Sequence, residues 1–336
     1  MGYMPVQGKI AELGSSPRAL IIKPSSLGDI IHSLPFLAAF KKRYPSSCVH
    51  WAVFRGLEGI LEGHPLIEKL IVIDKGRFKN PLTFPARALS LRSELKKHSY
   101  DIAVDLQGLL RSGLIAALSS APIRAGFSDA REGSPFFYTH SVRGGDNIHA
   151  VDRYLKIAGM LGCDISEVEF PMVHDEYSPP FDEEYAVLVP GARWDTKRWP
   201  ARNFGILASM LPLRTVVVGG REDIGIGEDV VAGSEGKCVN MAGKTSLREL
   251  SGLIRNARYV VTNDTGPMHI AAAHRVPVYA IFGPTNPVNT GPYGSMHAIL
   301  TPDIPCSPCY RRKCDDLRCM AAISPEEVIK TISSRN

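Results

Sequence analysis

Short apolar runs alternate with helix-like or loop segments along most of the chain, and this alternation constrains the fold more than any other feature. Apolar runs that end in turn residues predict buried strands. Strands that alternate with helices form a mostly parallel sheet, so the sequence predicts an α/β fold. The predicted strands lie in residues 18–24, 48–54, 69–74 and 101–106, and again in 185–191, 214–220, 238–243, 258–266 and 276–284.

The alternation pauses once, at the stretch VHDEYSPPFDEEY (residues 173–185), whose prolines and acids are typical of a linker. We therefore expect two doubly wound domains. The predicted parts are an N-terminal extension (1–16), a first domain (17–175), a linker (176–184) and a second domain (185–336). Ligands of such sheets bind beyond the carboxyl ends of the strands, so a cleft between the two domains is the expected site.

Several common functions are disfavoured. No strand is followed by a G-x-G-x-x-G dinucleotide motif, and the stretch CVNMAGKTS lacks the first glycine of a phosphate-binding loop because Cys238 occupies that position. A net charge of +5 is too weak to indicate nucleic-acid binding but suits an anionic substrate or an anionic membrane surface. Without a targeting segment or a membrane span, the expected location is the cytoplasm, where the seven cysteines would be reduced thiols.

The first candidate site is the stretch IIKPSSLGDIIHSLP (residues 21–35), where a loop of small residues separates a strand from an apolar helix. Gly28 permits a positive φ or close approach to a ligand, and Asp29 is placed to act as a catalytic base. The alternative is that Asp29 or Ser26 only caps the helix. Pro35 is expected to kink the helix or delay its start.

Two further loops follow strands in the second half. In VPGARWDTKRWPARNF (189–204), backbone N–H groups at Gly191 and Ala192 and the charge of Lys197 favour diphosphate binding over a solvated basic turn. In VTNDTGPMHIAAA (261–273), an oxygen-rich turn meets a helix N-terminus. His269 there is expected either to contact a ligand or to cap a buried turn.

Five stretches occur in the order seen in the ADP-heptose:lipopolysaccharide heptosyltransferases, glycosyltransferase family 9: KPSSLGDIIHSLP, DLQGLLRSG, PGARWDTKRWP, NDTGPMHIAAA and FGPTNP. The chain resembles that family over residues 20–325. The resemblance implies the GT-B fold, with two Rossmann-like domains. It also implies an inverting, metal-independent transfer of heptose from ADP-heptose to the Kdo–lipid A inner core, without a cofactor and at the cytoplasmic face of the inner membrane.

The resemblance also implies roles for individual residues. Asp29 would be the base, and Lys197 would stabilise the departing ADP. Donor-binding positions would be Ala192, Arg193, Lys197, Glu222, Asp223, Thr245, Asp264, Thr265, Gly266 and His269, with Glu222 and Asp223 competing for the ribose. Acceptor-binding positions would be Ser26, Gly28, Arg111, Arg131 and Arg153. Ordinary surface charge is the alternative for the three arginines.

The subtype depends on two conflicting regions. SDAREGSPFFY and HAVDRYLKIAGMLG resemble heptosyltransferase I, whereas the cysteine-rich C-terminal stretch resembles heptosyltransferase II. We expect reduced thiols rather than a metal site at Cys306, Cys309, Cys314 and Cys319, because their spacing matches no standard pattern. The alternatives to heptosyltransferase I are heptosyltransferase II, another family-9 transferase, and a nucleotide-sugar binding protein without turnover.

Overall fold

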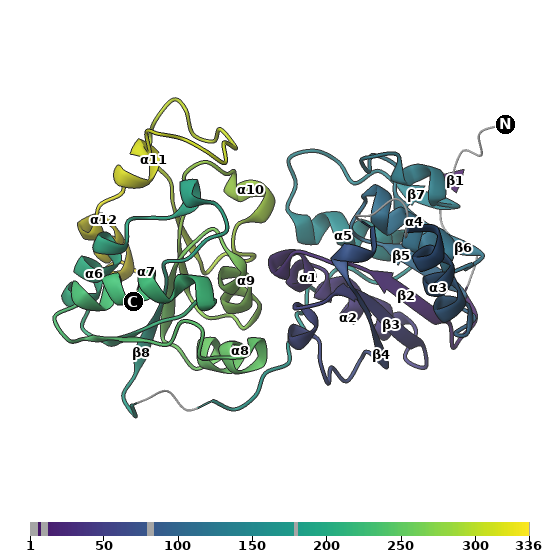
Figure 1. The fold of residues 1–336 in the computed structure, drawn as a ribbon, viewed down its shortest axis with the longest axis horizontal. Helices are drawn as coiled ribbons and strands as arrows, with labels where there is room; N and C mark the ends of the chain where they lie inside the picture. Colours follow the sequence, from purple (N-terminus) through teal and green to yellow (C-terminus); the bar gives the residue numbers. More distant parts are fainter. Residues whose placement is uncertain (1–5, 8–12, 79–83, 178–180, 336) are drawn as a thin grey trace. The chain divides into compact units, whose positions relative to one another are not determined.

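The computed structural model describes residues 6–7, 13–78, 84–177 and 181–335. The chain divides into two compact units, Met1–Val173 and His174–Asn336, and each is described by itself (Figure 1). At the start of the second unit, Asp175, which was predicted to end the first domain, pairs with Arg248 of the second unit at 2.6 Å.

Unit 1 contains a parallel sheet of seven strands within the described residues, in the order β1-β7-β6-β5-β2-β3-β4. The strands are β1 (Val6–Gln7), β2 (Arg18–Ile22), β3 (Cys48–Phe54), β4 (Lys69–Ile73), β5 (Ile102–Asp105), β6 (Ile123–Phe127) and β7 (His140–Val142). Apart from the short edge strand β1, the order is that of a doubly wound Rossmann sheet. β1 lies in the predicted N-terminal extension, which therefore contributes to the sheet.

Helices cover both faces of this sheet (Figure 1). One group comprises α1 (Leu27–His32), α2 (Leu34–Arg43) and α5 (Ala150–Met160), and the other comprises α3 (Phe84–Lys96) and α4 (Leu110–Leu118). Short 3-10 helices are η1 (Glu58–Ile60), η2 (Lys75–Phe78) and η3 (Ser134–Phe137). The predicted effect of Pro35 is confirmed: the chain breaks at Ser33 and Pro35 lies in the first turn of α2, where its missing N–H costs no helical hydrogen bond.

Unit 2 repeats the architecture with six parallel strands in the order β10-β9-β8-β11-β12-β13. They are β8 (Tyr185–Val189), β9 (Arg214–Val217), β10 (Cys238–Asn240), β11 (Tyr259–Asn263), β12 (Val278–Ile281) and β13 (Ala298–Leu300). Every residue of β8 and β11 is buried, as expected for central strands of a sheet covered on both faces.

The helices of unit 2 also form two groups (Figure 1). On one face lie α6 (Ala201–Met210), α7 (Ile224–Ala232) and α12 (Pro325–Ser333), and on the other lie α8 (Leu247–Arg255) and α9 (Gly266–Ala273). α6 and the end of α7 can pack closely because Gly205 has no side chain: a Cβ there would lie only 2.9 Å from the Cα of Gly233. The shorter elements are η4 (Asp195–Lys197), η5 (Arg221–Asp223), α10 (Pro287–Thr290) and α11 (Arg318–Ala321).

All nine predicted strands are present, and the predicted doubly wound α/β architecture is confirmed. The strands that the sequence did not reveal are β1, β6, β7 and β13. Among the described residues, no helix has both the length and the apolar character needed to cross a membrane.

Candidate active site

The strand order reverses once in each sheet, between β2 and β5 in unit 1 and between β8 and β11 in unit 2. The chain leaves these neighbouring strands toward opposite faces, which opens a crevice at their carboxyl ends where ligands of such folds bind. Asp29 follows β2, Lys197 follows β8, and Asp264 follows β11 directly. Each unit therefore places predicted site residues at its own switch point.

Asp29 both caps α1 and presents a second oxygen beyond the cap. Its Oδ2 accepts hydrogen bonds from the Ser26 backbone N at 3.0 Å and from Ser26 Oγ at 2.7 Å, which completes a capping box. The capping alternative considered from the sequence is thus realised by one carboxylate oxygen. Gly28 lies in the first turn of α1 and does not adopt a positive φ, so it is not a left-handed turn residue.

The other oxygen of Asp29 faces two residues that sequence reasoning missed. Tyr154 donates its hydroxyl proton to Asp29 Oδ1 at 3.2 Å, and the Lys23 Nζ lies 3.7 Å from the same oxygen. Lys23 also donates to the Tyr154 hydroxyl at 2.7 Å and to the Leu106 carbonyl at 3.1 Å. The available signal was a lysine that directly follows the buried apolar run ALII (residues 19–22).

Exposure and charge distinguish the two ends of this cluster. The Lys23 side chain is 2% exposed, whereas that of Asp29 is 33% exposed. Burial alone would raise the pKa of Asp29, but the Lys23 ammonium and hydrogen bonds from Ser26 and Tyr154 outweigh it and hold this pKa below its usual value. Burial lowers the pKa of Lys23, and Asp29 and Asp105 oppose that shift. Asp29 is therefore an accessible carboxylate that stays ionised near neutral pH.

Asp105, at the end of β5, is a second buried acid beside this cluster. Its Oδ1 accepts from the backbone N–H groups of Gln107 and Gly108, and its Oδ2 accepts from the Tyr138 hydroxyl at 2.7 Å. Burial raises its pKa despite these bonds. The Gly108 carbonyl in turn accepts from the Arg131 backbone N–H, so Asp105 fixes the turn that supports the loop of Arg131.

The three predicted acceptor arginines differ in their surroundings. Arg111, in the first turn of α4, and Arg131 are exposed. Arg153 is partly buried: its guanidinium pairs with Asp129 at 2.9 Å and stacks on the Phe127 ring at 4.4 Å. Arg153 thus has a structural partner, while the other two are open to an anionic ligand.

In unit 2, Lys197 and Asp264 meet directly. The Lys197 Nζ lies 2.6 Å from Asp264 Oδ2, which also accepts from Thr285 Oγ1 at 2.7 Å. Here the lysine side chain is 17% exposed and the carboxylate 8% exposed. Thr285 was not predicted as a site residue, although it lies within the stretch FGPTNP. The cluster presents a cation that is oriented by a buried acid.

Asn263 fixes the loop of Lys197 against β11. Its Oδ1 accepts from the Trp199 backbone N–H at 3.0 Å, and its Nδ2 donates to the Pro190 carbonyl at 2.8 Å. Within the loop, Arg198 donates to the Ala192 carbonyl at 2.9 Å. Ala192 is buried and the predicted donor residue Arg193 is exposed, so main-chain contacts are the ones that Ala192 can offer.

The start of α9 supplies a predicted anion-binding position. Thr265 is the N-cap residue, Gly266 begins the helix, and both are partly exposed. The first N–H groups of a helix lack intrahelical partners and carry the positive end of its dipole. Pro267 has no N–H, so the donors available here are those of Thr265 and Gly266. His269 lies buried one turn further along.

The two acids that compete for the ribose role have different environments. Asp223 is buried, accepts from the Gly220 backbone N–H at 2.9 Å, and fills the space that a Cβ on Gly191 or Gly219 would need. Burial raises its pKa. Glu222 is exposed. Thr245, in the loop after β10, is partly exposed.

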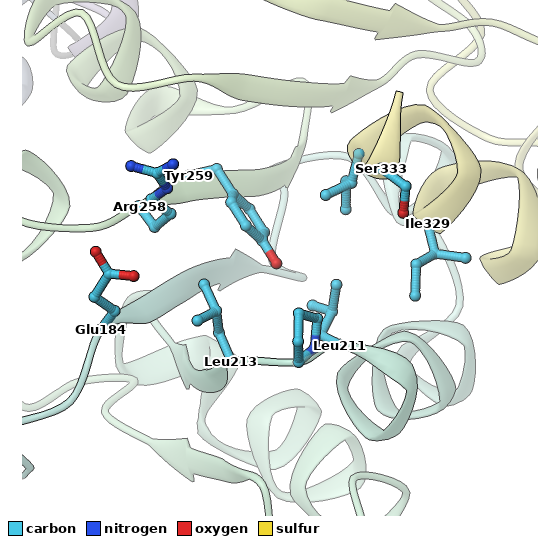
Figure 2. A pocket seen from close by; sticks show the side chains of 9 residues that line it. Glu184, Leu211, Leu213, Arg258, Tyr259, Ile329 and Ser333 are labelled. Atoms are coloured by element: carbon cyan, nitrogen blue, oxygen red, sulfur yellow. The ribbon is translucent and has the colours of Figure 1, made fainter. Parts of the chain in front are cut away.

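A cavity of about 280 Å³ in unit 2 lies at the other end of the sheet (Figure 2). Tyr259 points into it between Leu211 and Leu213, with Glu184 and Arg258 nearby. These residues precede or begin β8, β9 and β11, so the cavity lies at the amino ends of the strands. It is therefore separate from the cluster of Lys197 and Asp264.

The C-terminal cysteines, all within the described part of the chain, form no disulfide. Cys319 is buried, Cys306 is exposed, and Cys309 and Cys314 are intermediate. The four do not bring three ligand atoms within 4.8 Å of one another in the described structure.

Comparison with known proteins gives consistent results. The model of Glycosyltransferase family 9 (heptosyltransferase) matches residues 88–319. Lipopolysaccharide heptosyltransferase 1 of Pseudomonas aeruginosa is 30% identical over 317 residues, covering 88% of this chain and 87% of that protein. Lipooligosaccharide heptosyltransferase 2 of Haemophilus influenzae is also 30% identical, covering 84% and 87%. The solved structure of the Escherichia coli heptosyltransferase WaaC with ADP matches with a TM-score of 0.79 and 23% identity. The match covers 95% of this chain and all of that one, which shows a shared fold.

Proposed function

Because the chain belongs to glycosyltransferase family 9 (heptosyltransferase), we propose that it transfers heptose from ADP-heptose to the Kdo sugar of the lipid A inner core, as heptosyltransferase I. The observation that carries the proposal is the carboxylate of Asp29, which has one oxygen held by Ser26 and the other directed at Tyr154 beside a switch point. A fixed, ionised and partly exposed carboxylate is the group that a base-assisted glycosyl transfer requires.

We propose a single displacement on the acceptor side. As the acceptor oxygen forms a bond to the anomeric carbon, Asp29 takes the hydroxyl proton, and the bond from that carbon to the phosphate oxygen breaks. Attack opposite the departing ADP inverts the anomeric centre. The lowered pKa of Asp29 makes it a weak base, so proton transfer accompanies bond formation rather than preceding it.

On the donor side, we propose that Lys197 and the N-terminus of α9 at Thr265 and Gly266 bind the diphosphate. Asp264 holds the lysine in place before the donor arrives, and the Thr285 hydroxyl in turn orients the Asp264 carboxylate. An oriented ammonium group and helix N–H groups stabilise the negative charge that develops on ADP. In this scheme, transfer requires no divalent cation. Of the two acids near the ribose position, the exposed Glu222 is available to a ligand, whereas Asp223 already holds its own turn.

For the acceptor, we propose that Arg111 and Arg131 bind the carboxylates and phosphates of Kdo–lipid A, because a planar guanidinium pairs bidentately with such groups. Two apolar side chains support a peripheral position on the inner membrane: Phe136 is 86% exposed and Leu110 is 48% exposed. Both belong to elements that pack together, η3 and α4, which also carry or adjoin the two arginines. An exposed aromatic beside cations suits an anionic lipid surface.

Heptosyltransferase II is the second candidate, favoured by the equal identity to the Haemophilus influenzae relative and by the cysteine-rich C-terminal segment. The two reactions differ in the acceptor. Heptosyltransferase I would use Kdo2–lipid A, while heptosyltransferase II would require the heptosylated product.

The test is ADP-heptose turnover with each acceptor, comparing the unmodified enzyme with Asp29→Asn. Asparagine keeps an oxygen that can accept from Ser26, so the cap on α1 is retained while the base is lost. Asp152→Asn is the matched control, since Asp152 is an exposed acid in the first turn of α5. We expect product on Kdo2–lipid A from the unmodified enzyme and from Asp152→Asn, and none from Asp29→Asn.

Other outcomes identify the alternatives. Product only on the heptosylated acceptor would establish heptosyltransferase II. Binding of ADP-heptose without turnover on either acceptor would indicate another acceptor or a binding protein. Equal product from Asp29→Asn and the unmodified enzyme would mean that Asp29 is only a helix cap.

A further inference from the structure

At the amino ends of β3 and β4 in unit 1, three side chains that the proposed transfer reaction does not use lie close together. Cys48 begins β3, and His50 lies two residues further, so both side chains project from the same face of the strand. Glu68 directly precedes β4, and its backbone N–H donates to the Val49 carbonyl at 2.8 Å. Because β3 and β4 are parallel neighbours, their amino ends meet here, away from the carboxyl ends near Asp29.

The three side chains have the spacing of a metal site. One ligand atom from each of Cys48, His50 and Glu68 lies within 4.8 Å of the other two, and this is the only such group of His, Cys, Asp or Glu in the described residues. The Cys48 Sγ lies 3.5 Å from His50 Nε2. Tetrahedral zinc, with Zn–S near ~2.3 Å and Zn–N near ~2.0 Å, holds sulfur and nitrogen about 3.5 Å apart. These two ligands are thus already at the required separation.

The surroundings of His50 select the nitrogen that faces Cys48. Its Nδ1 lies 2.8 Å from the Tyr100 hydroxyl, which leaves Nε2 on the side of the sulfur. An imidazole whose second nitrogen is held by an outer partner is the usual arrangement of a histidine ligand.

We propose that Cys48, His50 and Glu68 bind a divalent transition metal of the zinc class, with water as the fourth ligand. The mixed sulfur, nitrogen and oxygen donors suit a borderline-soft ion, and the exposed Glu68 leaves the site open to solvent. Binding replaces the proton of the Cys48 thiol, which goes to solvent. The thiolate and the Glu68 carboxylate then balance the charge of the ion, against the opposing charges of Lys69 and Arg18 nearby.

Metal binding requires the Cys48 thiolate, so the thiol must lose its proton first. Since the metal competes with that proton, metal affinity should rise with pH. Without metal, the same three groups form a simple hydrogen-bonded cluster, which is the alternative that an experiment must exclude.

The test is titration of the full chain with Co²⁺ and then with Zn²⁺. The C-terminal cysteines are a second possible ligand set, so the parent protein carries Cys306→Ser, Cys309→Ser and Cys314→Ser. We expect one Co²⁺ per chain with a thiolate-to-cobalt charge-transfer band, which Zn²⁺ abolishes. Cys48→Ser should remove the band, and Tyr100→Phe should weaken binding about 10- to 100-fold by freeing the His50 ring. Cys163→Ser, which changes another buried free thiol of unit 1, is the matched control and should bind normally.

A second measurement needs no substitution in the site. In the same parent protein, saturating Zn²⁺ should slow alkylation of Cys48 at least tenfold and leave that of Cys163 and Cys238 unchanged. No charge-transfer band, a band that survives Cys48→Ser, or equal alkylation of Cys48 with and without Zn²⁺ would overturn the proposal.

Discussion

Replacing Lys197 by methionine should damage both the stability of unit 2 and the transfer reaction, and a second substitution should separate the two effects. Methionine keeps the apolar stem and removes the charge that pairs with Asp264 at 2.6 Å. The Asp264 carboxylate, 8% exposed, would then keep only the Thr285 hydroxyl among these partners. Removing one partner of a buried pair costs about 3–5 kcal/mol. Because the lysine side chain is 17% exposed and water can enter, we expect about 3 kcal/mol.

The effect on catalysis follows from the proposed contact with the leaving diphosphate. Loss of one preorganised charge or donor at a developing anion lowers kcat by roughly 10²- to 10³-fold. The double variant Lys197→Met/Asp264→Asn removes the unpaired carboxylate, so it should recover most of the stability while kcat stays low. Asp264→Asn alone gives the contribution of the acid.

Stability is measured by hydrogen–deuterium exchange of β8 and β11, which reports on unit 2 separately from unit 1, and turnover by ADP release at saturating donor and acceptor. The reasoning is refuted if the double variant regains a rate within about tenfold of the unmodified enzyme, a margin far smaller than the loss expected from the missing donor. That result would mean that Lys197 acts on activity through folding alone.

Three other perturbations test separate parts of the structure. Tyr154→Phe removes a hydrogen bond that lowers the pKa of Asp29, so the acid limb of the pH profile of kcat/KM should move to higher pH. Asp29 should still act as the base at alkaline pH. An acid limb that does not move would contradict the assigned contact. Phe136→Asp should reduce binding to vesicles that contain anionic lipid, measured by co-sedimentation, without changing turnover on a soluble Kdo acceptor; unchanged sedimentation would remove Phe136 from the membrane surface. With a chelator present, the free energy of unfolding, measured by urea titration, should fall by up to about 3 kcal/mol as pH drops from 6.5 to about 4. The reason is that burial lowers the pKa of His50 in the folded chain, so the unfolded chain takes up the proton first. His50→Gln should flatten this pH dependence.

The central strands were predictable because parallel sheets bury both faces and so require continuous apolar runs. β6 escaped detection for the opposite reason: its sequence, IRAGF, contains a charged residue and a glycine. The glycine is needed because the ring of Tyr138 occupies the space where a Cβ on Gly126 would lie. β7 and β13 span only three residues each, too few to show a pattern.

The candidate site was predictable only in part. Asp29, Lys197 and Asp264 each follow a strand at its carboxyl end, where the topology rule places ligand-binding groups. Tyr154 lies 125 residues from Asp29 in sequence and meets it because α5 packs against α1. Thr285 reaches Asp264 from the loop after the neighbouring strand β12. Periodicity and local spacing carry no record of such long-range pairs, so a fold was needed to find them.

The two units place the same pair of residue types at their switch points, and the more exposed member of the pair differs between them. In unit 1 the lysine is 2% exposed and the acid 33% exposed, with 3.7 Å between Lys23 Nζ and Asp29 Oδ1. In unit 2 the acid is 8% exposed and the lysine 17% exposed, with 2.6 Å between the charged atoms. Each buried charge stabilises and orients its exposed partner, since an ion pair in a region of low dielectric holds its geometry more strongly than one in water.

This inversion gives each unit a different chemistry from the same topology. An exposed carboxylate can accept a proton from a hydroxyl, and an exposed ammonium can bind a phosphate. If the arrangement is functional, exchanging the signs within one pair should retain its charge balance and destroy its role. Lys197→Asp combined with Asp264→Lys should therefore leave a pair that is neutral overall, but the charge at position 197 would be negative and would repel the diphosphate. Donor affinity should then fall far more than the free energy of unfolding of unit 2. Donor binding by calorimetry and exchange of β8 and β11 would measure the two effects, and equal donor affinity in the exchanged variant would show that the sign of the exposed charge does not matter.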